Sequence, residues 1–264
     1  MHDIKSYYEL LFIIVLLSAF LNAILGFGFA IIFSPVFIAF LEPNILIQVS
    51  GLLTLLVVFI LSIFLFKFCN YKLLFKSILF SLPAYPVGYL FISEVNSIFI
   101  KIIALAVVFL SIKNIIYSEF KNEIITYDIK AKSDLKSISN KNYFINFLAP
   151  FFAGFLNQTL AMPGPAIIGF YRKFNLDQNT LKATLAAFMT VSYSILMISQ
   201  FFFIGISNQT FSIVKMFFIP VSIGLILGFF FNKKISEKFY LKVTLVVLFS
   251  VLISLIINIF NSIS

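Results

Sequence analysis

One stretch of the chain, Asn157 to Tyr171 (NQTLAMPGPAIIGFY), is polar and rich in proline and glycine although it lies inside a long apolar segment. Proline lacks a backbone N–H and clashes with the preceding helical turn, so a regular lipid-facing helix does not continue through it. At membrane depth, irregular backbone is tolerated only where it is buried in protein or lines a wet cavity. The stretch therefore predicts a broken helix inside a membrane protein.

A similar interruption occurs earlier in the chain, from Leu21 to Pro35 (LNAILGFGFAIIFSP). Two interrupted hydrophobic segments at corresponding positions of two halves are the sequence pattern of a transporter's substrate site. We therefore expect the two breaks to meet and to form a binding site together.

The composition of the chain supports an integral membrane protein. Of its 264 residues, 61% are hydrophobic and 11% are charged, whereas a soluble domain is about 45–50% apolar and about 25% charged. The formal charge of +9 resides mainly at segment ends and in loops, where lysines orient a chain and contact lipid headgroups. We therefore expect a multi-pass protein of the plasma membrane, with membrane lipid and no nucleic acid among its partners.

The apolar runs predict an all-α integral membrane fold with about eight transmembrane segments in two homologous halves, each opening with a broken or re-entrant helix. The first half covers residues 1–117, a polar, charged linker covers 118–142, and the second half covers 143–264. When the second half is shifted by about 135 residues, Asn157 falls on Asn22 and the Pro163–Pro165 break falls on the Gly26–Gly28 break. This shared order indicates an internal duplication.

The orientation in the membrane depends on how often the chain crosses. If all eight segments cross once, Lys67 and Lys72 share one side with the termini, and Arg172, Lys173 and Lys182 lie on the other. The cations then divide eleven against eight, a small excess that favours cytoplasmic termini. Re-entrant broken segments would change this count.

Several kinds of chemistry are disfavoured by what the apolar segments contain. All ten acidic residues lie near a terminus, a segment end or the linker, so no carboxylate is available for an intramembrane proton or sodium relay. One cysteine, Cys69, and one histidine, His2, do not make a metal site. We expect neither a metal nor another cofactor.

The remaining polar groups suit a small anion, because helix N-termini and neutral donors favour negative charge. Glycines would let the backbone approach the ligand, amides and hydroxyls would donate hydrogen bonds, and one lysine would supply charge. The candidate substrate-binding residues are Asn22, Gly26, Gly28, Ser50, Asn157, Gln158, Thr159, Pro163, Gly164, Pro165, Lys182 and Thr184. Each also has a structural alternative: interhelical hydrogen bonds for the polar residues, close helix packing for the glycines, and snorkelling for Lys182.

The two breaks resemble the sulfite exporter TauE/SafE family of membrane permeases. The resemblance rests on GFGFAIIFSPVFIAFLEP (Gly26 to Pro43), on MPGPAIIGFY (Met162 to Tyr171) and on LKATLAAF (Leu181 to Phe188), and it spans roughly Leu10 to Phe260. It implies a permease or exporter of sulfite, sulfonate or related organosulfur anions that works by alternating access. The chain departs from the family pattern at Lys182, where arginine is common, and the resemblance leaves the particular anion open.

Two other functions fit the sequence less well than a permease. A membrane-embedded enzyme acting on lipid needs an activated nucleophile, and no His, Asp or Glu lies at membrane level to activate a Ser, Thr, Tyr or Lys. A non-transporting scaffold or accessory subunit has no need of two broken helices in lipid. The sequence indicates neither the oligomeric state nor the direction of transport.

Overall fold

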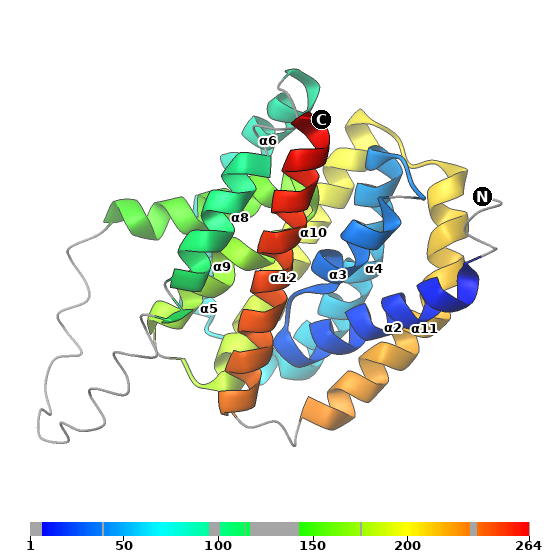
Figure 1. Ribbon diagram of the computed structural model, residues 1–264. Coiled ribbons are helices and arrows are strands. Elements are labelled where there is room, and N and C mark those ends of the chain that lie inside the picture. Colours follow the sequence, from blue (N-terminus) through cyan, green and yellow to red (C-terminus); the bar gives the residue numbers. More distant parts are fainter. Residues whose placement is uncertain are drawn as a thin grey trace, which may run out of the picture.

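The computed structural model describes residues 7–38, 40–94, 101–113, 115–116, 143–174, 176–232 and 237–263, and this part of the chain contains helices and no strands (Figure 1). The α-helices are α2 (Tyr8–Leu25), α3 (Phe29–Phe37), α4 (Pro43–Leu65), α5 (Tyr71–Ser81), α6 (Ala84–Glu94), α8 (Tyr143–Leu160), α9 (Gly164–Tyr171), α10 (Gln178–Phe203), α11 (Asn208–Asn232) and α12 (Glu237–Ile263). Two 3₁₀ turns follow α4 and α9, namely η1 (Phe66–Phe68) and η3 (Arg172–Phe174). Residues 101–113 and 115–116 are also helical.

Five of these helices are long and apolar enough to cross a membrane: α2, α4 with η1, α10, α11 and α12. The count rises to six if α5 and α6, which meet at a bend of 40°, form one span. The described residues therefore form an all-α fold with five or six candidate membrane spans, fewer than the eight expected. The predicted linker, 118–142, lies outside them.

Both interrupted segments are broken where left-handed backbone ends a helix. α2 ends at Gly26, whose φ is 80°, and α3 begins after Gly28, whose φ is 115°. α8 is followed by Ala161 with φ 53°, a left-handed conformation that glycine adopts readily and alanine rarely does. Pro163 then precedes α9.

The helices on either side of the two breaks keep a constant spacing along the chain. α2 begins at residue 8 and α8 at 143, α3 at 29 and α9 at 164, and α4 at 43 and α10 at 178. Each second helix thus begins 135 residues after the first. A shift of 135 is also the one at which the two sequence breaks coincide.

The helices α4 and α10 lie against each other in the centre and run antiparallel. At one end of the pair, the Asn70 backbone N–H donates to Thr184 Oγ1 at 3.0 Å, so the end of α4 meets the start of α10. At the other end, Gln48 Nε2 donates to the Gly205 carbonyl at 2.9 Å, so the start of α4 meets the end of α10.

This arrangement corrects the expected distribution of charge. Lys67 and Lys72 flank Asn70 and therefore lie at the same end as Lys182, not on the opposite side. The prediction was wrong because it let the first broken segment cross once. The Tyr7 and Phe40 rings are 5.7 Å apart, so the segment from α2 to α3 enters and leaves at one end of the bundle.

Close packing ties the two parts of the chain together. α2 lies along α11, where a Cβ on Gly228 would come within 2.6 Å of the Phe20 carbonyl oxygen. α8 lies along α5 and α6, where a Cβ on Gly154 would come within 2.7 Å of the Ser81 carbonyl oxygen. The first helix of each part therefore packs against the third segment of the other.

Candidate functional site

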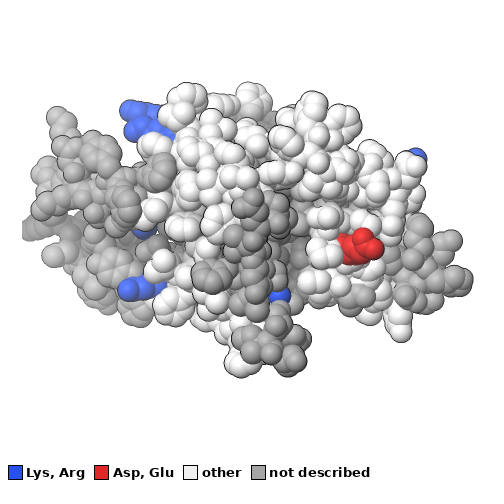
Figure 2. Space-filling view, turned by 90° about the horizontal axis from the view of Figure 1, so that it is seen from above, with Lys and Arg blue, Asp and Glu red and all other residues white. Residues whose placement is uncertain are grey.

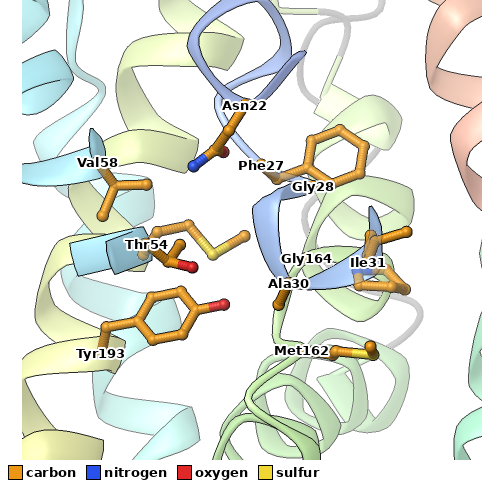
Figure 3. Close-up of a pocket in the computed structure, with 12 residues that line it drawn as sticks. Asn22, Phe27, Gly28, Ala30, Ile31, Thr54, Val58, Met162, Gly164 and Tyr193 are labelled. Atoms are coloured by element: carbon orange, nitrogen blue, oxygen red, sulfur yellow. The ribbon is translucent and has the colours of Figure 1, made fainter. Parts of the chain in front are cut away.

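The two breaks face each other across a small pocket in the middle of the bundle (Figure 3). Its lining comes from α2, both breaks, α3, α4, α9 and α10. The lining residues are Asn22, Phe27, Gly28, Ala30, Ile31, Thr54, Val58, Met162, Gly164, Pro165, Met189 and Tyr193. The open space between these side chains is about that of one water molecule, so a larger ligand requires the side chains or helices to move apart.

Most of the lining is built from matched positions of the two parts. Four pairs of lining residues are separated by 135: Phe27 and Met162, Ala30 and Pro165, Thr54 and Met189, and Val58 and Tyr193. The pocket thus lies between helices whose first residues are 135 positions apart.

The N-termini of two helices point into this pocket. Gly28 precedes α3 and Pro163 precedes α9, and neither helix has a side-chain cap. The first backbone N–H groups of a helix have no partner within the helix, and together they carry a partial positive charge. At α9 these are the Gly164 and Ala166 N–H groups, because Pro163 and Pro165 have none. Two uncapped N-termini facing one pocket favour an anion over a cation.

Asn22 supplies a polar side chain to the same pocket. It is fully buried, and neither its amide nitrogen nor its amide oxygen has a hydrogen-bond partner among the described residues. Figure 3 shows the amide directed into the space between the first break and the α4–α10 pair. A buried amide without partners costs about 1–3 kcal/mol, and a water molecule or a ligand atom in the pocket would satisfy it.

Two tyrosines hold the backbone at the breaks. Tyr240 on α12 donates its hydroxyl to the Leu25 carbonyl at 2.6 Å, and Tyr193 on α10 donates to the Ala161 carbonyl at 2.7 Å. Both carbonyls lie at the end of a helix, where they lack a partner within the helix. The tyrosines therefore stabilise the two irregular segments without blocking the N-termini of α3 and α9.

The structure brings four of the candidate residues to the pocket: Asn22, Gly28, Gly164 and Pro165. Gly164 lies at the closest approach of the two breaks, since a Cβ there would come within 2.8 Å of Phe27 Cδ2. The other eight candidates lie elsewhere.

Three of those eight are consecutive residues on α8 and make structural bonds. Asn157 Nδ2 donates to the Ser192 carbonyl at 2.8 Å. Gln158 Nε2 donates to Ser199 Oγ at 3.0 Å, and Thr159 Oγ1 donates to the Phe155 carbonyl of its own helix at 2.9 Å.

The other five candidates lie near the pocket but are not part of its lining. Pro163 precedes α9, and Ser50 lies on α4, buried and without a side-chain partner among the described residues. Thr184 donates to the Thr180 carbonyl at 2.7 Å in addition to accepting from Asn70. Gly26 and Lys182 contact each other, because a Cβ on Gly26 would lie 3.3 Å from Lys182 Cγ.

The sequence analysis did not identify the pocket walls contributed by α4 and α10. Thr54, Met189 and Tyr193 look like ordinary residues of apolar spans. Thr54 and Met189 are 135 residues apart, which is the shift at which the two sequence breaks coincide, and this shared spacing is the signal in the sequence that pairs them. The described residues hold no group of three or more His, Cys, Asp or Glu side chains that could bind a metal ion.

Comparison with known proteins gives one match. The model of the family described as Sulfite exporter TauE/SafE matches residues 11–255 of this chain of 264 residues. No curated protein and no solved structure matches it significantly. The matched region includes both breaks and every residue that lines the pocket.

Proposed function

The chain belongs to the sulfite exporter TauE/SafE family, and from this membership we propose that it carries sulfite, sulfonate or related organosulfur anions across the plasma membrane. Membership makes it a multi-pass transporter of the sulfite-exporter type. The particular anion and the transport cycle are our proposal.

One observation carries the choice of an anion: the uncapped N-termini of α3 and α9 meet at a pocket that also holds the unpartnered Asn22 amide. A sulfite or sulfonate oxygen accepts hydrogen bonds and donates none, which matches N–H groups. The thioether of Met189 and the ring of Phe27 add an apolar wall for the organic part of a sulfonate.

Two inverted halves and alternating access account for the geometry of the pocket. α4 and α10 occupy corresponding positions in the 135-residue spacing, yet they run antiparallel. Corresponding helices of opposite direction are typical of inverted repeats, whose substrate site lies between them. The closed pocket would then open alternately toward each end as one half tilts against the other.

The ends of the bundle differ in charge, and this difference gives an orientation. The end formed by Lys67, Lys72, Arg172, Lys173 and Lys182 is called the basic end here. Figure 2 looks down on the opposite end, where most of the coloured side chains are basic but lie apart from one another, beside one acidic patch. Lysine and arginine accumulate on the cytoplasmic side of membrane proteins. We therefore place the basic end in the cytoplasm, and Tyr7, which lies at the opposite end, outside.

The membrane potential then supplies a driving force for export. An inside-negative potential favours the exit of an anion by about 2.3 kcal/mol per charge per 100 mV. Transport without a coupling ion is consistent with the absence of acidic residues from the interior of the apolar segments.

Proteoliposomes containing the purified protein test this function. Sulfite, sulfate, taurine, sulfoacetate and acetate would each be loaded inside, and efflux measured while a potassium gradient with valinomycin sets the voltage. We expect sulfur oxyanion efflux that increases with voltage at a fixed gradient. Voltage-independent flux would contradict electrogenic export, and no flux of any anion by folded protein would favour an accessory subunit.

A further inference from the structure

The proposed transport pathway would open at the two ends of the bundle, and these ends, called mouths here, carry different residues at positions 135 apart. Arg172, Lys173 and Lys182 lie at the basic end, at the end of α9 and the start of α10. The residues 135 positions earlier, at the end of α3 and the start of α4, are Phe37, Ile38 and Ile47. Three cations at one mouth thus replace three apolar side chains at the other.

Lys182 is the most unusual of the three cations because it is enclosed by protein. Only 1% of its surface is exposed, and its Nζ has no hydrogen-bond partner among the described residues. Its Cγ and its carbonyl oxygen would lie 3.3 Å and 3.2 Å from a Cβ on Gly26, so the side chain packs directly against the first break. Burying an ammonium group without a counter-ion costs several kcal/mol, and an anion would remove that cost.

The position of Lys182 on α10 connects it with the pocket. It precedes the lining residue Met189 by seven residues, which is nearly two full helical turns. Both residues therefore lie on the same face of α10, with Lys182 about 10 Å nearer the basic end. An anion bound at Lys182 would therefore be about 10 Å from the level of Met189 in the pocket, along the axis of α10.

Arg172 is connected to the same break through Tyr240. Its guanidinium lies 5.3 Å from the centre of the Tyr240 ring, and the Tyr240 hydroxyl donates to the Leu25 carbonyl next to Gly26. Arg172 itself is 8% exposed. Two mostly buried cations thus lie near the first break: Lys182 packs against Gly26, and Arg172 lies against Tyr240, which bonds to Leu25.

Among the described residues, the end of α3 at the opposite end of the bundle is lined by aromatic rings. Phe29, Phe33 and Phe37 form a stack along α3, with ring centres 5.3 Å and 3.9 Å apart, and Phe37 packs edge-on against Phe217 of α11 at 5.3 Å. All four rings are fully buried. A column of phenyl rings excludes ions and closes that end of the pathway.

We infer that Lys182, with Arg172 behind it, forms a second anion site that loads small sulfur oxyanions into the pocket from the cytoplasmic end only. This inference rests on the proposed function and adds an access site to it. The cationic mouth concentrates anions on the inner side, while the phenylalanine column at the outer mouth holds none.

Sided transport and direct binding, both with sodium sulfite, test the inference. The variants are Lys182→Gln, which removes the charge, Lys182→Arg, which retains it, and Ile47→Gln at the corresponding position of the other mouth. In inside-out vesicles, whose basic end faces the medium, we expect Lys182→Gln to raise the half-saturating sulfite concentration for uptake by about tenfold or more. In right-side-out vesicles the change should stay within about twofold, and Lys182→Arg and Ile47→Gln should resemble the wild type in both.

The outcomes separate the access site from the proposed function. If the wild type transports sulfite and Lys182→Gln alters neither side, or both sides equally, the access site is wrong and the proposed function stands. If the wild type transports no sulfite, titration calorimetry of the purified full-length chain decides. Sulfite binding that is lost in Lys182→Gln and retained in Lys182→Arg supports the site without transport. Binding unaffected by Lys182→Gln, or no binding by the wild type, overturns it.

Discussion

Asn22 and Asn157, which are 135 residues apart, each accept at the backbone carbonyl a hydrogen bond from the left-handed residue of a break. The donors are the Gly26 N–H at 2.8 Å and the Ala161 N–H at 2.9 Å, and both donor residues have positive φ. The two side chains have diverged, because Asn157 donates to the Ser192 carbonyl whereas Asn22 has no partner among the described residues. The two positions thus make the same backbone hydrogen bond, but both amide atoms of Asn22 lack a partner, whereas Asn157 lacks one only at Oδ1.

This difference predicts opposite effects of the same substitution. Asn22→Leu should abolish sulfite transport while leaving the thermal stability of the purified protein unchanged or raised, because it removes an unsatisfied amide. Asn157→Leu should reduce stability by about 1 kcal/mol, since it removes a buried hydrogen bond, and should leave residual transport. Thermal unfolding in detergent and flux in proteoliposomes measure the two effects. Loss of stability in Asn22→Leu with normal transport would show that Asn22 has a structural role.

The sequence predicts the breaks well and the side chains around them poorly, for a physical reason. A break is local: Gly26, Gly28 and Pro163 carry their backbone preferences wherever they occur. The direction of a side chain depends on the rotation of its helix. The packing of α8 against α10 decides this rotation, and it directs the Asn157 and Gln158 side chains to bonds with Ser192 and Ser199 of α10 and not into the pocket.

The glycine at the first break should be required both for its backbone conformation and for its location. Gly28→Ala introduces a side chain at φ 115°, where a Cβ costs about 1–2 kcal/mol. Gly205→Ala is a matched control, because Gly205 has φ 82°, no atom within 4 Å of its added Cβ and no place in the pocket lining. We expect both variants to lose similar thermal stability and Gly28→Ala alone to lose most of its transport. Equal transport by the two variants would mean that the break does not contact the substrate.

The two tyrosines that cap the breaks should each contribute to stability. Tyr240→Phe removes the bond to the Leu25 carbonyl, and Tyr193→Phe removes the bond to the Ala161 carbonyl. Each leaves a buried carbonyl without its partner, so each should lower the free energy of unfolding by about 1–3 kcal/mol. Tyr71→Phe, whose hydroxyl donates to the Phe66 carbonyl at an exposed site, is the control and should have a smaller effect. If all three variants lose the same free energy of unfolding, the bonds to the carbonyls at the breaks contribute no more to stability than an exposed bond.

The only cysteine of the chain, Cys69, provides a test of the orientation. It lies next to Asn70 at the basic end and is partly exposed. A membrane-impermeant maleimide should therefore label it in inside-out vesicles and leave it unlabelled in right-side-out vesicles, with Cys69→Ser as the control for background. Burial raises the pKa of the thiol, an effect that a hydrogen bond with Thr184 partly offsets. Because the thiolate is the reactive form, labelling at neutral pH should be slower than for an ordinary exposed cysteine and should accelerate as the pH rises toward that raised pKa. Labelling from the outside alone would invert the proposed orientation and place the basic mouth outside the cell.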